Sequence, residues 1–417
     1  MLPSLPCCIL IALPALLVQA STADSSKKSP AASRPPAPPG DPSWALGLRL
    51  YQGLRLDSVS VNTLFSPLLL ASSLSALCDG SAGTTASQLQ DLLKAPSPAK
   101  TEADTGVILS GALKSLSEAN GSSFNLHAST ALFSKQASQL NQEFVKGSQT
   151  KFQVQHQPLE EGDSKSDLKQ FQRWAKTGLG GLEGAPLVAE IQAKTGALFL
   201  ANALRFRGLW EREFSKESAD LRTFLGKKYT KVMMMHRAGL YHHYEDVENM
   251  VQVLEVPLWG GKASVVLLLP FHVESLGRLE KLLTVELLSK WLEKTNTTSV
   301  IISLPIANIT STLSLQTRLS AMGLTDAWDQ KVADFSGVSE KKKEKLYLGG
   351  VLHWASLELT AEAGRGGAEL EEEHVEKPKL FYADHPFIFF VRDNTSGALL
   401  LMGALDHAEG EALHDEL

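Results

Sequence analysis

Cysteine is scarce in this sequence. There are 3 cysteines among 417 residues, and two of them, Cys7 and Cys8, fall within the first twenty positions. If that segment is cleaved, Cys78 alone remains, and a single thiol cannot close an internal disulfide. A small disulfide-stapled scaffold is therefore excluded, and stability has to come from a large apolar core. We expect Cys78 to be buried, with pairing to a second chain as the alternative.

Motifs for the common catalytic chemistries are also missing. The sequence has no GxSxG nucleophile elbow and no HExxH zinc motif. His242 and His243 are adjacent, so on a strand they would face opposite ways and could not chelate one ion. The glycines at positions 178, 180, 181 and 184 do not fit GxGxxG and favour a loop over a phosphate-binding turn. We therefore expect neither an enzyme nor a bound metal or cofactor.

A large net charge is absent as well. The 40 Lys and Arg residues against 46 Asp and Glu residues give −6 at pH 7, which makes no electrostatic case for nucleic acid. Hydrophobic residues make up 43% of the chain, enough for a large core and unlike a disordered protein. A basic run is expected in a solvated connection, with a polyanion-binding patch as the alternative: Lys341, Lys342, Lys343 and Lys345.

Long apolar runs are confined to the N-terminus. The run at 7–18 is interrupted by Pro14 and falls short of the about 20 residues needed to span a bilayer. Val18 and Ala20 form the small-residue pattern that precedes a cleavage site, here before Ser21. We interpret residues 1–20 as a cleaved signal peptide, with a membrane anchor as the alternative. Residues 21–42 are rich in Ser and Pro and are predicted to be a disordered arm.

The other end of the chain carries a second targeting signal. Residues 406–417 form a tail whose last four residues are His414, Asp415, Glu416 and Leu417. A terminal HDEL is bound by a receptor that returns escaped proteins to the endoplasmic reticulum. Entry signal and retrieval signal together predict a resident of the endoplasmic reticulum lumen that has this receptor as a partner and no membrane insertion.

Sites for N-glycosylation fit that route. Four Asn-x-Ser/Thr acceptors follow the signal segment: Asn120, Asn296, Asn308 and Asn394. We expect only some of them to carry glycan. Asn394 is the weakest candidate, because it lies in a predicted hairpin connection where packing would hinder modification.

Apolar patterning predicts a mixed α+β chain. Trp44, Leu48 and Tyr51 recur on one helical face. Residues 62–93 indicate a short strand, a Ser-Pro break, an apolar helix, a Gly-rich turn and a second helix. Leucines and Trp291 between 276 and 292 predict an amphipathic helix. Strands are predicted within 198–214, 228–244, 264–269 and 300–304, and the runs 387–391 and 398–402 flank a polar connection, as in a buried β-hairpin.

Several of these stretches resemble one family. The string ADHPFIFFVRDNTSGALLLMGAL at 383–405 closely resembles the C-terminal signature of serpins, and 62–93 resembles their N-terminal signature. The segments 198–214, with Trp210, and 333–359 resemble two approaches to the central sheet of that family. The resemblance runs from residue 62 to 405 without a gap for a second domain. It implies one serpin domain at 43–405, with a large central sheet, further sheets, a helical cluster and an exposed reactive-centre-type loop.

Inhibition of a secretory-pathway serine protease is the alternative function, and it depends on that loop. Inhibitory serpins insert the first half of the loop into the large sheet, using Gly-Thr and a run of alanines. Here Ala363 and Gly364 stand at those two positions, glycines at 364, 366 and 367 weaken a strand, and Glu372 would have to face the core. The resemblance puts the bait bond in a window that serine proteases cut poorly: Val375, Glu376, Lys377 and Pro378.

The string LFYADHPF at 380–387 is similar to the collagen-binding chaperones of the serpin family. That resemblance implies that Asp384 pairs with an arginine of Gly-Xaa-Arg in a procollagen triple helix, while Leu380 and Tyr382 pack on neighbouring chains. Arg222 would be a further contact. Alternation along a strand puts residues 380, 382 and 384 on one face. The alternatives are ordinary strand packing for Leu380 and Tyr382, and a family turn residue for Asp384. We expect a non-inhibitory monomer.

Release of cargo in a more acidic compartment would need histidines, whose ordinary pKa is about 6.5. Four candidates resemble histidines of the chaperones: His236, His272, His353 and His385. His353 has an alternative structural role, because serpins generally have a core histidine at this point, hydrogen-bonded near residues that match Asn202 and Ser66. The pair Phe271-His272 replaces a histidine pair, so the pH response is expected to differ.

Overall fold

The protein is described by a computed structural model. It describes residues 41–57, 62–94, 102–135, 140–160, 163–187, 191, 193–215, 217–341, 345–367 and 375–412. All of them fall in one compact unit that runs from Pro35 to Leu417. The predicted signal peptide, residues 21–40 of the predicted arm, residues 342–344 and 368–374, and the terminal HDEL lie outside the described residues. The last two residues of the predicted arm belong to the fold instead, because Asp41 is buried and α1 begins at Pro42.

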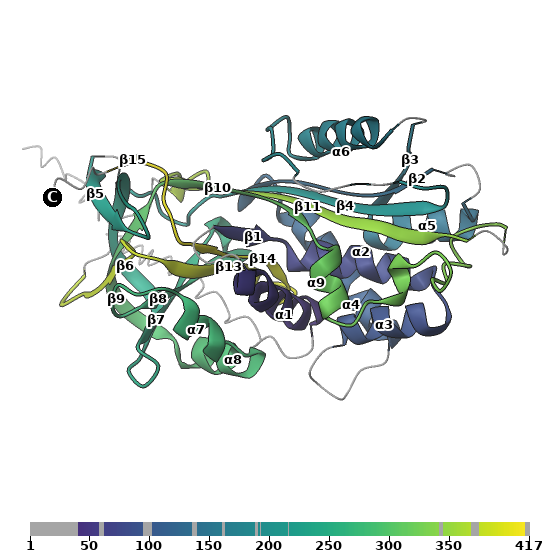
Figure 1. Ribbon diagram of the computed structural model, residues 1–417. Helices are drawn as coiled ribbons and strands as arrows, with labels where there is room; N and C mark the ends of the chain where they lie inside the picture. Colours follow the sequence, from purple (N-terminus) through teal and green to yellow (C-terminus); the bar gives the residue numbers. More distant parts are fainter. Residues whose placement is uncertain are drawn as a thin grey trace, which may run out of the picture. The chain divides into compact units, whose positions relative to one another are not determined.

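The described strands form two sheets (Figure 1). The smaller sheet has the order β10 (Ala307–Ser314), β11 (Tyr347–Leu359), β4 (Ala197–Gly208), β2 (Phe124–Ser134), β3 (Val154–Pro158). The larger sheet has the order β1 (Thr63–Phe65), β14 (Leu399–Leu405), β13 (Phe387–Asp393), β8 (Ala263–Pro270), β7 (Val251–Pro257), β6 (Tyr229–Asp246), β9 (Asn296–Pro305), β12 (Lys379–Tyr382). Two more strands pair with β6, namely β5 (Asp220–Leu225) and β15 (Glu411–Ala412).

Helices cover these sheets. They are α1 (Pro42–Asp57), α2 (Pro67–Asp79), α3 (Gly83–Leu93), α4 (Glu102–Ala119), α5 (Gln142–Phe152), α6 (Ser164–Gly178), α7 (Gly277–Leu282), α8 (Val285–Lys294) and α9 (Gln316–Ala321), with short 3-10 turns at Trp259–Gly261 and Asp326–Trp328. Helix α6 lies on one face of the smaller sheet and α2 on the other (Figure 1). Within the described ranges, no helix is long and apolar enough to cross a membrane.

Local signals explain where the helices begin. Ser66 caps α2, because its side chain accepts a hydrogen bond from the Leu69 N–H, and Pro67 takes the first helical position. The predicted single amphipathic helix across 276–292 is instead two helices. Thr284 accepts a hydrogen bond from the Leu287 N–H and so caps α8, which separates it from α7. Both helices still bury the leucines that carried the prediction.

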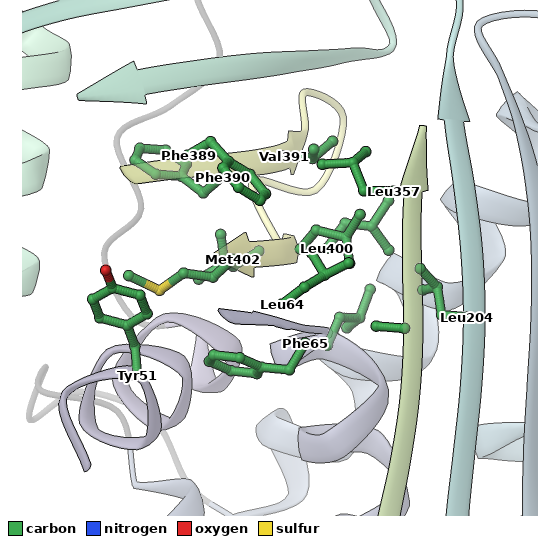
Figure 2. Close-up of a cluster of buried hydrophobic side chains, with 14 of the residues drawn as sticks. Tyr51, Leu64, Phe65, Leu204, Leu357, Phe389, Phe390, Val391, Leu400 and Met402 are labelled. Carbon is green, nitrogen blue, oxygen red and sulfur yellow. The ribbon is translucent and has the colours of Figure 1, made fainter. Parts of the chain in front are cut away.

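The predicted C-terminal hairpin forms the centre of the larger core. Strands β13 and β14 pair antiparallel, and β14 pairs on its other side with β1. Figure 2 shows Phe389, Phe390 and Met402 of the hairpin packing with side chains of β1, α1 and the smaller sheet. Segments from both ends of the chain therefore complete one core.

The smaller of the two sheets holds the segments within 198–214 and 333–359 that resemble the central sheet of the family, and it is closed between β4 and β11. The two strands pair in parallel from Tyr347 beside Ala197 to Glu358 beside Arg207, so no further strand lies between them. Arg205 forms a salt bridge with Glu358 at 2.5 Å, which links the same two strands. After β11 the chain continues beside the segment that follows β4, where Ala363 forms a parallel bridge with Trp210 and the carbonyl of Glu362 accepts a hydrogen bond from the Trp210 N–H at 3.0 Å. The first residues of the predicted reactive loop therefore pair beyond the end of β4 and are not inserted between β4 and β11.

Candidate ligand-binding face

The candidate collagen-binding residues come together on one face of the larger sheet. Strand β12 pairs in parallel with β9, and β9 pairs antiparallel with β6, which also pairs with β5. The register puts Tyr382, Ser303 and His236 side by side in one row across β12, β9 and β6. The adjacent strands β5 and β6 therefore form one surface with β9 and β12, which lie far from them in sequence.

The backbone of residues 380–384 alternates as predicted. Phe381 and Ala383 are fully buried and point into the core. Leu380 is 65% exposed, and Tyr382 and Asp384 are partly exposed. The three side chains that sequence reasoning selected thus share the outer face of this segment, because successive side chains of a strand point to opposite sides.

Asp384 is fixed by its neighbours. Its carbonyl accepts a hydrogen bond from the Leu225 N–H at 2.6 Å. Its carboxylate Oδ1 lies 2.8 Å from Nδ1 of His385, and Nε2 of the same ring lies 2.9 Å from the Pro270 carbonyl. Both ring nitrogens face acceptors, and only the imidazolium can donate to both at once. His385 is buried, so it holds Asp384 from the protein side and leaves the outer side of the carboxylate for a ligand.

Arg222 lies on β5 at the border of this face, and its guanidinium is already paired. Its Nε donates to Oδ1 of Asp220 at 2.9 Å, and its Nη2 lies 2.6 Å from Oδ2 of the same carboxylate. This pairing raises the pKa of Arg222. Asp220 was missed by sequence reasoning. The available signal was its position two residues before Arg222, which on a strand means the same face.

His236 connects Asp220 to the β12 residues. Its Nε2 lies 2.9 Å from Oδ1 of Asp220, and its Nδ1 lies 2.7 Å from the Ser303 hydroxyl. Its ring stacks on Tyr382 at a centroid distance of 6.5 Å. Hydrogen bonds from Arg222 and His236 lower the pKa of Asp220, and burial raises the pKa of Tyr382. The face thus carries a connected network of hydrogen-bonded polar side chains beside the exposed apolar side chain of Leu380.

Two other histidine candidates lie elsewhere. His272 is exposed in the turn after β8. His353 is fully buried in β11, beside Asn202 of β4, and its Nε2 accepts a hydrogen bond from the Ser66 N–H at 2.9 Å. Burial lowers the pKa of His353 to about 3. Its ring therefore stays neutral in a mildly acidic compartment.

The remaining predicted sites are dispersed. In the loop window, Glu376 and Lys377 are exposed, Val375 and Pro378 are half-buried, and the backbone of Lys377 has a positive φ of 47°. Of the four glycosylation candidates, Asn120, Asn296 and Asn308 are exposed.

Asn394 differs from the other three. It is half-buried, donates from Nδ2 to the Gly261 carbonyl at 3.1 Å and accepts a hydrogen bond from the Ser264 hydroxyl. No group of three or more His, Cys, Asp or Glu side chains that could hold a metal gathers in the parts of the chain that the structure describes.

The two sheets, the closed β4 and β11 pair and the C-terminal hairpin define a serpin fold, and the chain belongs to the serpin family. Residues 43–407 match the family model described as Serpin (serine protease inhibitor). The chain is 38% identical over 378 residues to Serpin H1 of Mus musculus, covering 90% of this chain and 89% of that protein. It is 35% identical to Serpin H1 of Bos taurus, with 98% and 99% covered.

More distant relatives support the same fold. Leukocyte elastase inhibitor A of Rattus norvegicus is 28% identical over 375 residues, covering 85% of this chain and 96% of that protein. The crystal structure of uncleaved ovalbumin matches with a TM-score of 0.77 at 22% identity, and that of a tumour suppressing serpin with 0.75 at 23%. Each covers 88% of this chain and 98% of its own. The predicted serpin fold is confirmed.

Proposed function

We propose that this protein is a non-inhibitory serpin of the endoplasmic reticulum lumen that binds triple-helical procollagen at Gly-Xaa-Arg sites as a molecular chaperone. The observation that carries the proposal is the outward row of Leu380 and Tyr382 on the edge strand β12 and of Asp384 two residues beyond its end. These residues belong to the LFYADHPF string that resembles the collagen-binding serpins. The terminal HDEL supports the compartment.

The chemistry of this face suits a polyproline-like rod. Each chain of a collagen triple helix is extended, with Gly at every third position, so the outer positions present side chains and proline rings to a partner. Leu380 offers apolar area to such rings, and Tyr382 adds an aromatic surface. Asp384 offers a carboxylate for an arginine at the Y position. A charge-assisted hydrogen bond of this kind contributes about 1.5–3 kcal/mol, or roughly 10-fold to 150-fold in affinity.

Release in acid follows from the groups that face Asp384. When His385 takes up a proton, its imidazolium neutralises Asp384 from the buried side and competes with the arginine of the ligand. His236 adds a second positive charge beside Tyr382 when it is protonated, and it faces Asp220, Arg222 and Ser303 across β5 and β9. Both effects weaken the binding of a cationic ligand as the pH falls. His353 takes no part, because it stays neutral.

A binding assay tests the proposal. Mature protein is titrated against a triple-helical Gly-Pro-Pro peptide with one Gly-Xaa-Arg site, at about pH 7.4 and about pH 6. We expect binding at neutral pH, weaker binding in acid, and a loss of about 10-fold or more for Asp384→Asn. Asp91→Asn is the matched control, since Asp91 is an exposed aspartate on α3, outside the face. Absence of binding by the wild-type protein would refute the proposed function.

A further inference from the structure

The first half of the predicted tail is bound to the fold. Oδ1 of Asn62 accepts hydrogen bonds from the N–H groups of Asp406 and His407, at 2.8 Å and 3.0 Å, and its Nδ2 donates to the His407 carbonyl at 2.7 Å. The Thr230 hydroxyl donates to the Ala408 carbonyl at 2.9 Å, and Ala408 is buried. The chain is therefore held against the domain beyond the end of β14.

The tail then forms strand β15 on one edge of β6. Glu411 lies opposite Lys231, and Ala412 lies opposite Thr230, in antiparallel register. A Cβ on Gly410 would overlap the backbone carbonyl of Lys231, so this close approach requires glycine. The other edge of the same two β6 residues pairs with β5. Strand β15 is thus a third strand beside the hairpin of β5 and β6 (Figure 1).

Strand β15 leads directly into the predicted retrieval signal. Leu413 alone separates Ala412 from His414, the first residue of HDEL, and Leu413 and HDEL lie outside the described residues. An extended residue spans at most about 3.6 Å, so HDEL begins within about 7 Å of the paired strand. A receptor that binds so short a peptide encloses most of its surface in a concave site. While β15 is paired, the folded domain would collide with the wall of such a site.

The charge of the neighbouring turn favours the paired state. Because β15 runs antiparallel to β6, its C-terminal end points toward the turn that joins β5 to β6. Lys227 and Lys228 in this turn are exposed. HDEL contributes the opposite charge through Asp415 and Glu416. Attraction between these groups would oppose separation of β15, more strongly at low salt than at high salt.

We propose that β15 is a detachable strand that controls access to the retrieval signal, so that the receptor binds HDEL only after β15 has separated from β6. This inference rests on the retrieval signal of the proposed function and not on the binding of procollagen. Separation frees residues 409–412, which adds up to about 14 Å of reach. A strand of two residues at the end of a chain opens at low free-energy cost, so the open state is populated in the folded protein.

The apparent affinity for the receptor measures the fraction of molecules in which β15 is open. If about one molecule in ten is open, the mature protein should bind about 10-fold more weakly than a free peptide with the sequence of residues 406–417. Gly410→Ala should push β15 away from Lys231 and bring the affinity to within about 2-fold of the peptide. Gly147→Ala is the matched control, because a Cβ at this position of α5 meets nothing within 4 Å.

Two further variants separate opening of β15 from damage to the fold. Thr230→Val removes the hydroxyl that bonds the Ala408 carbonyl, and it should strengthen receptor binding by about 2-fold to 5-fold. Insertion of a flexible Gly-Ser linker of about six residues between Leu413 and His414 supplies the missing reach while β15 stays paired. This insertion should restore the affinity of the free peptide.

The experiment is competition of each protein against the labelled peptide for the purified receptor, with amide hydrogen exchange in β15 as a second measurement. Faster exchange together with stronger binding by Gly410→Ala supports the inference. Equal affinity of the wild-type protein and the peptide overturns it, and so does a linker insertion that gains no affinity. A peptide that does not bind the receptor would instead refute the predicted retrieval signal and the proposed compartment.

Discussion

Replacing His353 with glutamine should remove part of the acid sensitivity of the fold. His353 is fully buried, and its pKa falls from 6.5 to about 3 because burial penalises the charged ring. In the unfolded chain the ring is in water and titrates near 6.5. Between these values the unfolded state binds more protons than the folded state. The stability that comes from keeping His353 neutral is therefore fully present above about pH 6.5, and the free energy of unfolding declines as the pH falls toward 3.

The size of this effect at pH 5 follows directly. That pH lies about 1.5 pH units below the pKa of the histidine ring in the unfolded chain. Each unit is worth about 1.36 kcal/mol, so the free energy of unfolding falls by about 2 kcal/mol. Glutamine has an amide oxygen that can accept the Ser66 N–H hydrogen bond, and it does not titrate. The variant should be less stable than wild type at about pH 7.5. The difference should shrink by about 2 kcal/mol at pH 5.

Urea unfolding followed by tryptophan fluorescence at several pH values measures this difference. Trp354 is buried next to His353 in sequence and makes the transition visible. Comparing wild type with the variant cancels the titration of all other groups. His272→Gln, at an exposed position, controls for the substitution itself. A gap that stays constant from pH 7.5 to pH 5 would refute the reasoning, because the folded and unfolded rings would then titrate alike.

Three further predictions follow from other contacts. In the wild-type protein the guanidinium of Arg392 lies 2.7 Å from the carboxylate of the buried Glu255, and Arg392→Met removes this cation. The free energy of unfolding, measured in urea, should fall by about 3–5 kcal/mol. A loss under about 1 kcal/mol would contradict this. In protein made through a secretory pathway, Asn120→Gln, Asn296→Gln or Asn308→Gln should each remove glycan mass wherever the site is used. Asn394→Gln should leave the mass unchanged and lower the unfolding temperature, since its side chain bonds Gly261 and Ser264; glycan at Asn394 in the mass spectrum would show the opposite. Incubation with a trypsin-like protease should yield no SDS-stable complex, because the glycines at 364, 366 and 367 weaken an inserted strand and Glu372 would have to face the core. A stable complex would establish inhibition instead.

Local signals made most of the fold predictable. The Ser66-Pro67 pair marks the start of α2 because a hydroxyl cap and a fixed φ both act within one turn. The hairpin at β13 and β14 was predictable because both runs are apolar throughout and only a polar, Gly-containing segment joins them. The face of 380, 382 and 384 followed from the two-residue period of a strand. The division at Thr284 was missed, because the leucine spacing continues across the break and the cap depends on a single hydroxyl.

The candidate site was harder to predict where it depends on pairing between distant segments. Sequence alone does not say that β12 lies beside β9 or that β5 folds onto β6, because register is set by the whole sheet. Asp220 could not be recognised as part of the candidate site without that register, because the register is what brings His236 within hydrogen-bond distance of it. His353 shows the reverse case, in which burial in a second sheet removes a candidate that looked titratable in the sequence.

The joining of chain ends in one core sets a limit on when this protein can fold. The indole of Trp44 donates to the Gly397 carbonyl, 353 residues away, and β1 finds its partner only in β14. Ribosomes add about 5–20 residues per second, so the first helix waits roughly 20–70 s for the strands that cover it. During that interval its apolar side chains lack the strands that bury them in the folded protein. We propose that this protein protects unfinished procollagen, yet it cannot itself finish folding until its own synthesis is almost complete.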